Sequence, residues 1–195
     1  MNTRLAELIY ELSSLEYTVR AGWARLGIPP SIQETVADHS FGSSIIAIIL
    51  AVIDGTVDVG KVATLALLHD AAETRTGDMT PPLLEILDDI GVSRRRIEER
   101  AEELQRHGLP EDIQDLFRKT LEEYRAKETP EAKIASDAQL IDMGIQAIRY
   151  MSQGYTTTEF VGEIASRLQT DVGRELWSLI RENLKMSGDW FSRRP

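Results

Sequence analysis

Apolar residues recur every three or four positions along most of this 195-residue chain. This spacing places them on one face of an α-helix, whereas a half-buried strand would alternate at every second residue. No segment shows convincing strand alternation. The pattern therefore predicts an all-α helical bundle, and the length suits one domain with a C-terminal helical extension. The clearest early stripe consists of Leu5, Leu8, Ile9, Leu12, Leu15 and Val19.

Capping residues, prolines and glycines divide the pattern into helices. The most apolar segment, residues 36–53, predicts a central helix. Asp58 suits the cap of a third helix that runs to about Thr74. Thr129 followed by a proline is typical of a helix start, and it predicts a long helix to about Met151. We therefore divide the chain into two parts. Residues 1–155 are predicted to form the main domain, and residues 156–195 are predicted to form C-terminal helices that pack on it.

Charge and composition exclude several classes of protein. The chain has 22 basic and 32 acidic residues, a net charge of -10, whereas a protein that binds nucleic-acid polymers normally presents a basic face. It has no cysteine, which excludes disulfides and thiolate-bound zinc. Its first residues do not resemble a signal peptide, and its longest apolar run, residues 45–53, is shorter than the roughly 20 residues of a membrane span. We expect a cytoplasmic protein without a membrane partner.

Polar residues interrupt the predicted core stripes at three places. His39 lies in the first turn of the most apolar helix. His69, followed by Asp70, lies on the inward face of the third helix, and Asp137 lies on the inward face of the long helix. Taken singly, each is more often a hydrogen-bonded core residue than a ligand. Together, two imidazoles and two carboxylates suit a divalent metal with open coordination positions, because a buried carboxylate needs a partner.

The His69-Asp70 dipeptide is by itself a weak signal. Neighbours on a helix point about 100° apart, so the two side chains can share a metal only if the ion lies over the cleft between them. The remaining histidine, His107, lies in the last turn before Gly108, where a histidine suits the helix C-terminus. We therefore expect His107 to be structural.

The surroundings of the dipeptide carry a family resemblance. Residues 66–78 read ALLHDAAETRTGD, and RAGWARLGI and ETVADHSFGSS precede them, while EAKIASDAQLIDM follows. Over roughly residues 5–155, this order resembles the HD-domain phosphohydrolases, above all the small HD-domain 5'-deoxynucleotidases and their uncharacterised relatives. The resemblance implies an HD-domain helical bundle, a homodimer and one divalent metal ion per chain (Mn, Co, Fe, Ni, Zn or Mg). The implied ligands are His39, His69, Asp70 and Asp137.

The same resemblance implies an activity and further site residues. The substrate would be a deoxynucleoside 5'-monophosphate, hydrolysed to nucleoside and phosphate. Glu73 and Asp78 would act in proton transfer and in placing the attacking water, Arg20 would contact the phosphate, and Trp23 would pack on the sugar. From the residues alone, Asp78 equally suits a helix cap, Arg20 a surface position and Trp23 a lid on the core.

Two alternatives remain open at this point. One is an HD-type phosphodiesterase that acts on another nucleotide. The other is a metal-bound helical module that works through partner binding, for which Trp177 and Trp190 offer apolar contacts. The alarmone hydrolases of this fold carry a Glu-Asp pair three residues after the His-Asp, whereas this chain has Glu73-Thr74. The metal-free regulatory domains of the fold lack the ligands, whereas this chain retains all four implied ones.

Overall fold

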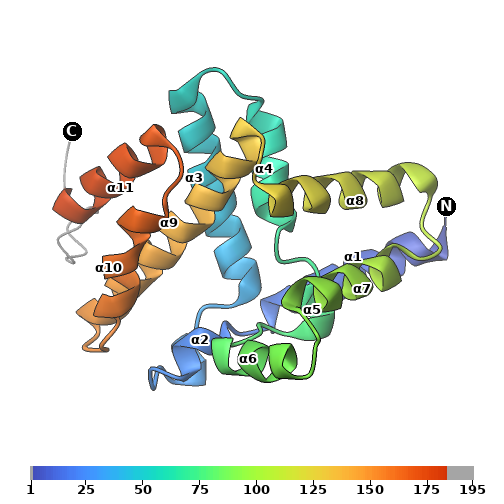
Figure 1. Ribbon diagram of the computed structural model, residues 1–195, viewed down its shortest axis with the longest axis horizontal. Coiled ribbons are helices and arrows are strands. Elements are labelled where there is room, and N and C mark those ends of the chain that lie inside the picture. Colours follow the sequence, from blue (N-terminus) through green and yellow to red (C-terminus); the bar gives the residue numbers. More distant parts are fainter. Residues whose placement is uncertain (1, 184–195) are drawn as a thin grey trace.

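The computed structural model describes residues 2–183, which form a bundle of α-helices (Figure 1). Within that range no strand forms, and the only β-type pairing is an isolated antiparallel bridge between Val19 and Thr35. The predicted all-α fold is confirmed. Short 3-10 turns occupy Ser14–Glu16 and Pro30–Ile32. The helices are α1 (Thr3–Ser13), α2 (Ala21–Ala24), α3 (Val36–Asp54), α4 (Val59–Leu68), α5 (Glu73–Thr76), α6 (Pro81–Asp89), α7 (Arg94–Arg106), α8 (Glu111–Ala126), α9 (Pro130–Ser152), α10 (Thr158–Arg167) and α11 (Asp171–Asn183).

The centre of the fold is α3, which packs against both α4 and α9. Thr35 and Asp38 start it with a reciprocal capping box, and Gly55 ends it with a left-handed backbone at φ 70°. By length and composition α3 is the one helix in residues 2–183 that could span a membrane, but its position here is that of a core helix. The expected central helix is thereby confirmed.

The C-terminal helices share the core of the bundle. α10 and α11 both pack on α9, and Ile164, Leu168 and Trp177 belong to the same hydrophobic cluster as the buried residues of α3 and α4. Gly144 allows this close approach, because a Cβ at that position would lie 2.5 Å from the Trp177 ring. The domain division at residue 155 stays a prediction. The burial of Trp177 removes one of the two tryptophans offered for partner contacts, and Trp190 lies outside the described residues.

The prediction of a continuous third helix to about Thr74 is wrong. α4 ends at Leu68, residues 69–72 form a tight turn, and α5 begins at Glu73. The turn is closed by three-residue bonds, such as the backbone N–H of Glu73 donating to the carbonyl of Asp70 at 2.9 Å. Ala71 and Ala72 continue the helical apolar pattern, so local sequence gave no sign of the break. His69 and Asp70 therefore lie in a turn, where the 100° rule for helix neighbours does not apply.

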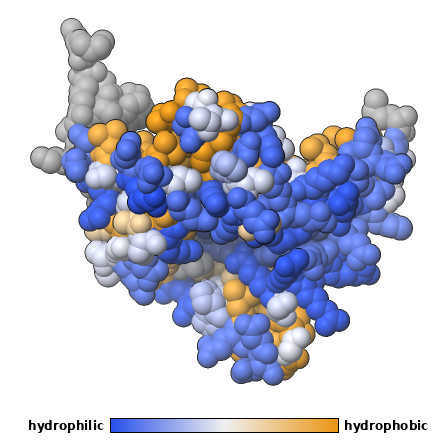
Figure 2. Space-filling model, turned by 45° about the horizontal axis from the view of Figure 1, so that its top comes forward, coloured by the Kyte–Doolittle hydropathy of each residue, from blue (hydrophilic) through white to orange (hydrophobic). Residues whose placement is uncertain are grey.

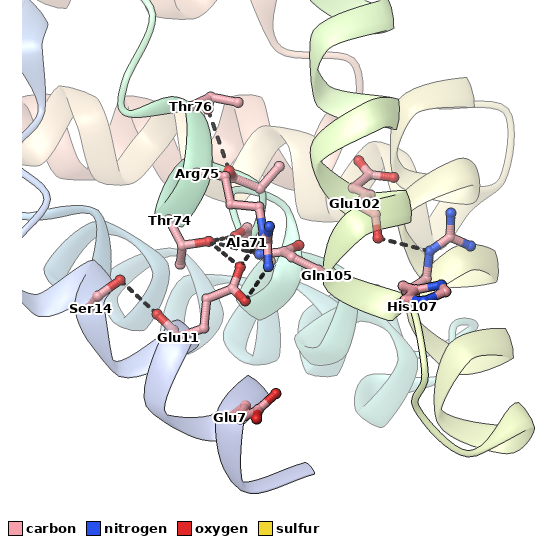
Figure 3. Close-up of polar contacts among 12 residues, drawn as sticks. Glu7, Glu11, Ser14, Ala71, Thr74, Arg75, Thr76, Glu102, Gln105 and His107 are labelled. Carbon is pink, nitrogen blue, oxygen red and sulfur yellow. Dashed lines mark hydrogen bonds and ion pairs between the residues drawn. The ribbon is translucent and has the colours of Figure 1, made fainter. Parts of the chain in front are cut away.

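Side-chain hydrogen bonds join the turn at residues 69–72 and α5 to α1 and α7 (Figure 3). Arg75 of α5 binds Glu11 of α1 through two contacts of 2.5 and 2.7 Å. The Gln105 amide of α7 donates to the carbonyl of Ala71 and to the Thr74 hydroxyl, each at 2.8 Å. These tertiary bonds hold the segment in its non-helical path. His107 lies at the C-cap of α7, as expected for a structural residue, and its backbone carbonyl accepts a bond from Arg4.

Candidate active site

Three of the four predicted metal ligands meet at one point of the fold. His39 comes from the first turn of α3, and His69 and Asp70 come from the turn after α4. One ligand atom from each of the three lies within 4.8 Å of the others. His39 is fully buried and Asp70 is 8% exposed. The fold therefore brings two imidazoles and one carboxylate together in a largely dry environment.

The hydrogen bonds of His69 show that its outer nitrogen is available for a metal. Its Nδ1 lies 2.7 Å from the carbonyl of Ala66, so Nδ1 carries the proton and Nε2 keeps its lone pair. Nε2 has no hydrogen-bond partner, yet it lies 3.1 Å from a carboxylate oxygen of Asp70. Two electron-rich atoms at this distance repel each other unless a proton or a cation lies between them. The donor set therefore fits a bound divalent cation.

Asp142 of α9 orients the ring of His39 so that its Nε2, like that of His69, is available for a metal. The Nδ1 of His39 lies 2.7 Å from Oδ2 of Asp142, and its buried Nε2 has no partner. A carboxylate behind an imidazole is the usual support for a metal-binding histidine. Burial lowers the pKa of His39 well below its ordinary value, which keeps the ring neutral. Sequence reasoning missed Asp142; the signal was a carboxylate between Ile141 and Met143 in an apolar helix.

Asp142 belongs to a buried polar network behind the metal cluster. Glu34 accepts a 2.7 Å bond from the indole N–H of Trp23 and lies 4.0 Å from the guanidinium of Arg20. Burial raises the pKa of Glu34 to about 7 and that of Asp142 to about 7. Both carboxyls therefore have pKa values close to neutral pH.

Gly42 makes room for Asp142, and this gives a first prediction. A Cβ at Gly42 would lie 2.0 Å from a carboxylate oxygen of Asp142. Gly→Ala inside a helix normally stabilises it by about 0.5–1 kcal/mol, but Gly42→Ala must displace the support of His39. We expect a 10- to 100-fold loss of Mn²⁺ affinity by titration calorimetry. Gly162→Ala in α10, where the space is open, is the control; equal affinity in both variants would contradict the assignment of Asp142.

Asp137, the fourth predicted ligand, does not lie in this cluster. Its side chain is fully buried, as expected, but both of its oxygens are engaged elsewhere. Oδ1 accepts from the backbone N–H of Gln169 at 2.9 Å, and Oδ2 accepts from the N–H and hydroxyl of Thr170 at 2.8 and 2.6 Å. Thr170 precedes α11, so Asp137 fastens the start of that helix to α9. Gly173 leaves the necessary space, since a Cβ there would lie 2.5 Å from Asp137.

Trp23 also lies elsewhere than predicted. It is 2% exposed and packs on Tyr150 and Phe160, with ring centroids 5.2 and 5.0 Å away. It does not line the cavity beside the metal cluster. The expectation that it stacks on a sugar is replaced by a core position, where its indole N–H holds Glu34.

The cavity beside the cluster contains the other predicted residues. It has a volume of about 480 Å³, and His69, Asp70, Arg20, Glu73 and Asp78 line it. A larger cavity of about 580 Å³ opens on the far side of Asp142, but neither His69 nor Asp70 lines it, so the smaller one is the candidate active site.

Arg20 and Asp70 form an ion pair in this cavity. An Nη1–Oδ2 distance of 3.2 Å joins them. Burial by itself would raise the pKa of Asp70, but the positive charge of Arg20 counteracts burial, and the pKa of Asp70 lies below its ordinary value. Asp70 is therefore ionised, and the guanidinium of Arg20 stands beside the point where the ligand atoms converge.

Glu73 is the buried carboxyl of the cavity. It is 4% exposed, and its Oε2 has no hydrogen-bond partner. Burial, together with the nearby carboxylates of Asp70 and Asp78, raises the pKa of Glu73 to about 9. Its nearest cation is Arg94, at 3.9 Å. A carboxyl that keeps its proton at neutral pH is suited to donate it to a leaving group.

Further cations surround the mouth of the cavity. Arg94 and Arg125 are paired with Glu98 and Glu102, whereas Lys127 and Arg167 complete the lining. With Arg20, these groups place five basic side chains in a lining that also contains five carboxyl groups.

Comparison with known proteins agrees with the fold. A family model described as "HD domain" matches residues 12–180. A protein from Cronobacter sakazakii named 5'-deoxynucleotidase is 30% identical over 126 residues, which are 62% of this chain and 63% of that protein. A human 5'-deoxynucleotidase is 28% identical over 147 residues, 75% of this chain and 68% of that protein. The chain thus spans less than two thirds of the Cronobacter relative.

Solved structures are similar over nearly the whole chain. A protein from Pyrococcus horikoshii is 26% identical, with a TM-score of 0.71 over 93% of this chain and 99% of that one. An HD-domain phosphohydrolase from Listeria innocua is 19% identical, with a TM-score of 0.70 over 97% of this chain and 90% of that one. The second likeness concerns the fold alone.

Proposed function

The chain belongs to the HD domain family, and from this premise we propose that it is a metal-dependent phosphohydrolase that converts deoxynucleoside 5'-monophosphates to nucleoside and phosphate. The observation that carries the proposal is the convergence of two unpartnered imidazole nitrogens, from His39 and His69, on the carboxylate of Asp70. A divalent cation held there would lower the pKa of a bound water and neutralise charge on the phosphate.

The side chains around the cluster supply the rest of the chemistry. Phosphoryl transfer needs positioning and charge neutralisation more than covalent catalysis. Arg20 would bind the phosphate oxygens, and Asp78 would orient the attacking water. As the water oxygen bonds to phosphorus and the bond to the 5'-oxygen breaks, Glu73 would give its proton to the departing sugar oxygen. The names of the relatives support the nucleotide as substrate, and the size of the cavity accommodates it.

A phosphate-release assay over a panel of substrates tests this proposal. The panel contains deoxynucleoside and ribonucleoside monophosphates, a cyclic nucleotide and a linear diester, each with several divalent metals after removal of bound metal by a chelator. We expect release from the monophosphates alone, and only after a metal is returned. Hydrolysis of a diester yields a monoester and no inorganic phosphate, so the diester reactions are followed by chromatography of the products. Diester hydrolysis without monophosphate turnover would favour the phosphodiesterase alternative.

Arg20→Ala tests the phosphate contact directly. A hydrogen bond to a charged group contributes roughly 1.5–3 kcal/mol, so the Michaelis constant should rise by about 10- to 150-fold. Arg25→Ala removes an exposed arginine five residues away that does not line this cavity, and it should leave the kinetics unchanged. If the two variants behave alike, Arg20 has no part in substrate binding.

We further propose a homodimer, as the resemblance implies, in the cytoplasm, as the lack of a signal-peptide pattern leads us to expect. One face of α3 is apolar and exposed, and Figure 2 shows apolar side chains gathered at the top of the molecule, where α3 ends. Covering such a face is the usual reason for self-association. Light scattering should give about twice the 21.9 kDa of one chain, and the mass of a single chain would contradict the proposal. The exposed side chains are Phe41, Ile45, Ile48, Ile49, Val52 and Ile53.

A further inference from the structure

The side chains of Asp137 and Gln139 lie on opposite sides of α9. They are two residues apart, which is about 200° around a helix. Asp137 faces α11, where its two oxygens are already bonded. Gln139 and Met143, one helical turn apart, both line the cavity that contains His69 and Asp70. The side chain that α9 presents to this cavity at position 139 is therefore an amide, while the carboxylate of Asp142 supports His39 from behind.

We propose that Gln139 is the group that α9 contributes to the bound cation, so that two imidazoles, one carboxylate and one neutral amide form the site. This inference rests on the proposed function, because it assumes that the cluster holds a metal. An amide oxygen is an acceptable ligand for hard and borderline divalent cations, either directly or through a water. Gln139 is partly buried and lines the same cavity as Asp70.

The carboxylates that line the cavity are less suited than Gln139 to be this fourth ligand. Glu98 and Glu102 are bonded to Arg94 and Arg125. On the side of α8, His69 is covered by the ring of Tyr124, whose centroid lies 5.2 Å from that of the imidazole. Glu73 and Asp78 remain, and the proposed chemistry uses both of them. Gln139 is thus the unassigned polar group of the wall.

The charge of such a site has a testable consequence. Two neutral imidazoles and one carboxylate carry one negative charge, which leaves a divalent cation with a net positive charge. Together with the positive charge of Arg20, this charge would be neutralised by a dianionic phosphate. Metal and phosphate should therefore bind cooperatively, and by linkage each must raise the affinity of the other by the same factor. A carboxylate at position 139 would tighten metal binding and weaken this coupling.

Titration calorimetry with Mn²⁺, with and without inorganic phosphate, tests the inference without an activity assay. Gln139→Glu adds a charge at constant size and should tighten Mn²⁺ binding by about tenfold or more in the absence of phosphate. Gln139→Leu removes the amide and should weaken it. Phosphate should tighten Mn²⁺ binding to the wild type by roughly 5- to 150-fold, the usual range of coupling, and by less in Gln139→Glu. Gln153→Glu adds the same charge at the exposed end of α9 and should change nothing.

The outcomes separate this inference from the proposed function. If the wild type binds Mn²⁺ and both Gln139 variants bind it equally well, the metal centre stands and Gln139 is not part of it. If the wild type binds no divalent cation, the proposed function itself fails. A melting temperature of the metal-free variants near that of the wild type shows that the changes in affinity do not arise from misfolding.

Discussion

Glu73→Gln is expected to lower turnover by roughly 10²–10⁴-fold while metal content and melting temperature stay near those of the wild type. The amide keeps the size of the acid but cannot supply a proton. Glu73 is buried in the cavity with an unpartnered oxygen, and none of the three clustered ligands is altered by the change. Steady-state kinetics on a deoxynucleoside monophosphate, with elemental analysis of the same sample, measures both quantities.

A second ester and a matched variant refine this experiment. An aryl phosphate has a leaving group that needs less protonation, so Glu73→Gln should lower its turnover less than that of the nucleotide. Equal losses on both esters would indicate that Glu73 positions the water. Glu98→Gln changes a glutamate that lines the same cavity but is bonded to Arg94, and it should retain most activity. Full activity of Glu73→Gln would remove this residue from the mechanism and move proton transfer to Asp78.

Asp137→Ala is expected to destabilise the fold and to leave the metal site intact. The substitution removes the acceptor for two backbone N–H groups and a hydroxyl at the start of α11. Each buried donor left unpaired costs roughly 1–3 kcal/mol, so a total loss of several kcal/mol is reasonable. For a chain of this size, each kcal/mol lowers the melting temperature by about 2–4 °C. Thermal unfolding of the metal-free protein measures the effect.

A nearby aspartate provides the control for Asp137. Asp171, in the first turn of α11, has a side chain that is 90% exposed and pairs only with Arg174, so Asp171→Ala should change the melting temperature little. Folded Asp137→Ala should bind Mn²⁺ with the affinity of the wild type. Loss of the metal at an unchanged melting temperature would instead identify Asp137 as a metal ligand.

The elements that are coded locally were predictable from the sequence. Asp58 caps α4 and Thr129 caps α9 through their side chains, as the sequence predicts. The end of α4 was not predictable in this way. The residues after His69 keep helical propensity and period, and it is Glu11 and Gln105, far away in the chain, that hold them in another path.

In the candidate site, too, the burial of a residue was predictable from nearby sequence, whereas its partners in distant helices were not. The apolar stripe of α9 correctly predicted that Asp137 is buried, but its partner depends on α11, more than 30 residues further along the chain. For the same reason the support of His39 by Asp142 of α9 could not be read from either segment alone. His39, His69 and Asp70 were named together through the family resemblance, and the fold does bring these three together.

Metal content is the most direct test of the account. The measurement is elemental analysis of the purified wild type beside His69→Ala, combined with phosphate release from a deoxynucleoside 5'-monophosphate before and after treatment with a chelator. The account predicts about one divalent metal ion per wild-type chain, little or none in His69→Ala, and activity that disappears with the chelator and returns with added metal. A wild-type protein that contains no metal, takes none up and releases phosphate at the same rate in the presence of the chelator would contradict it.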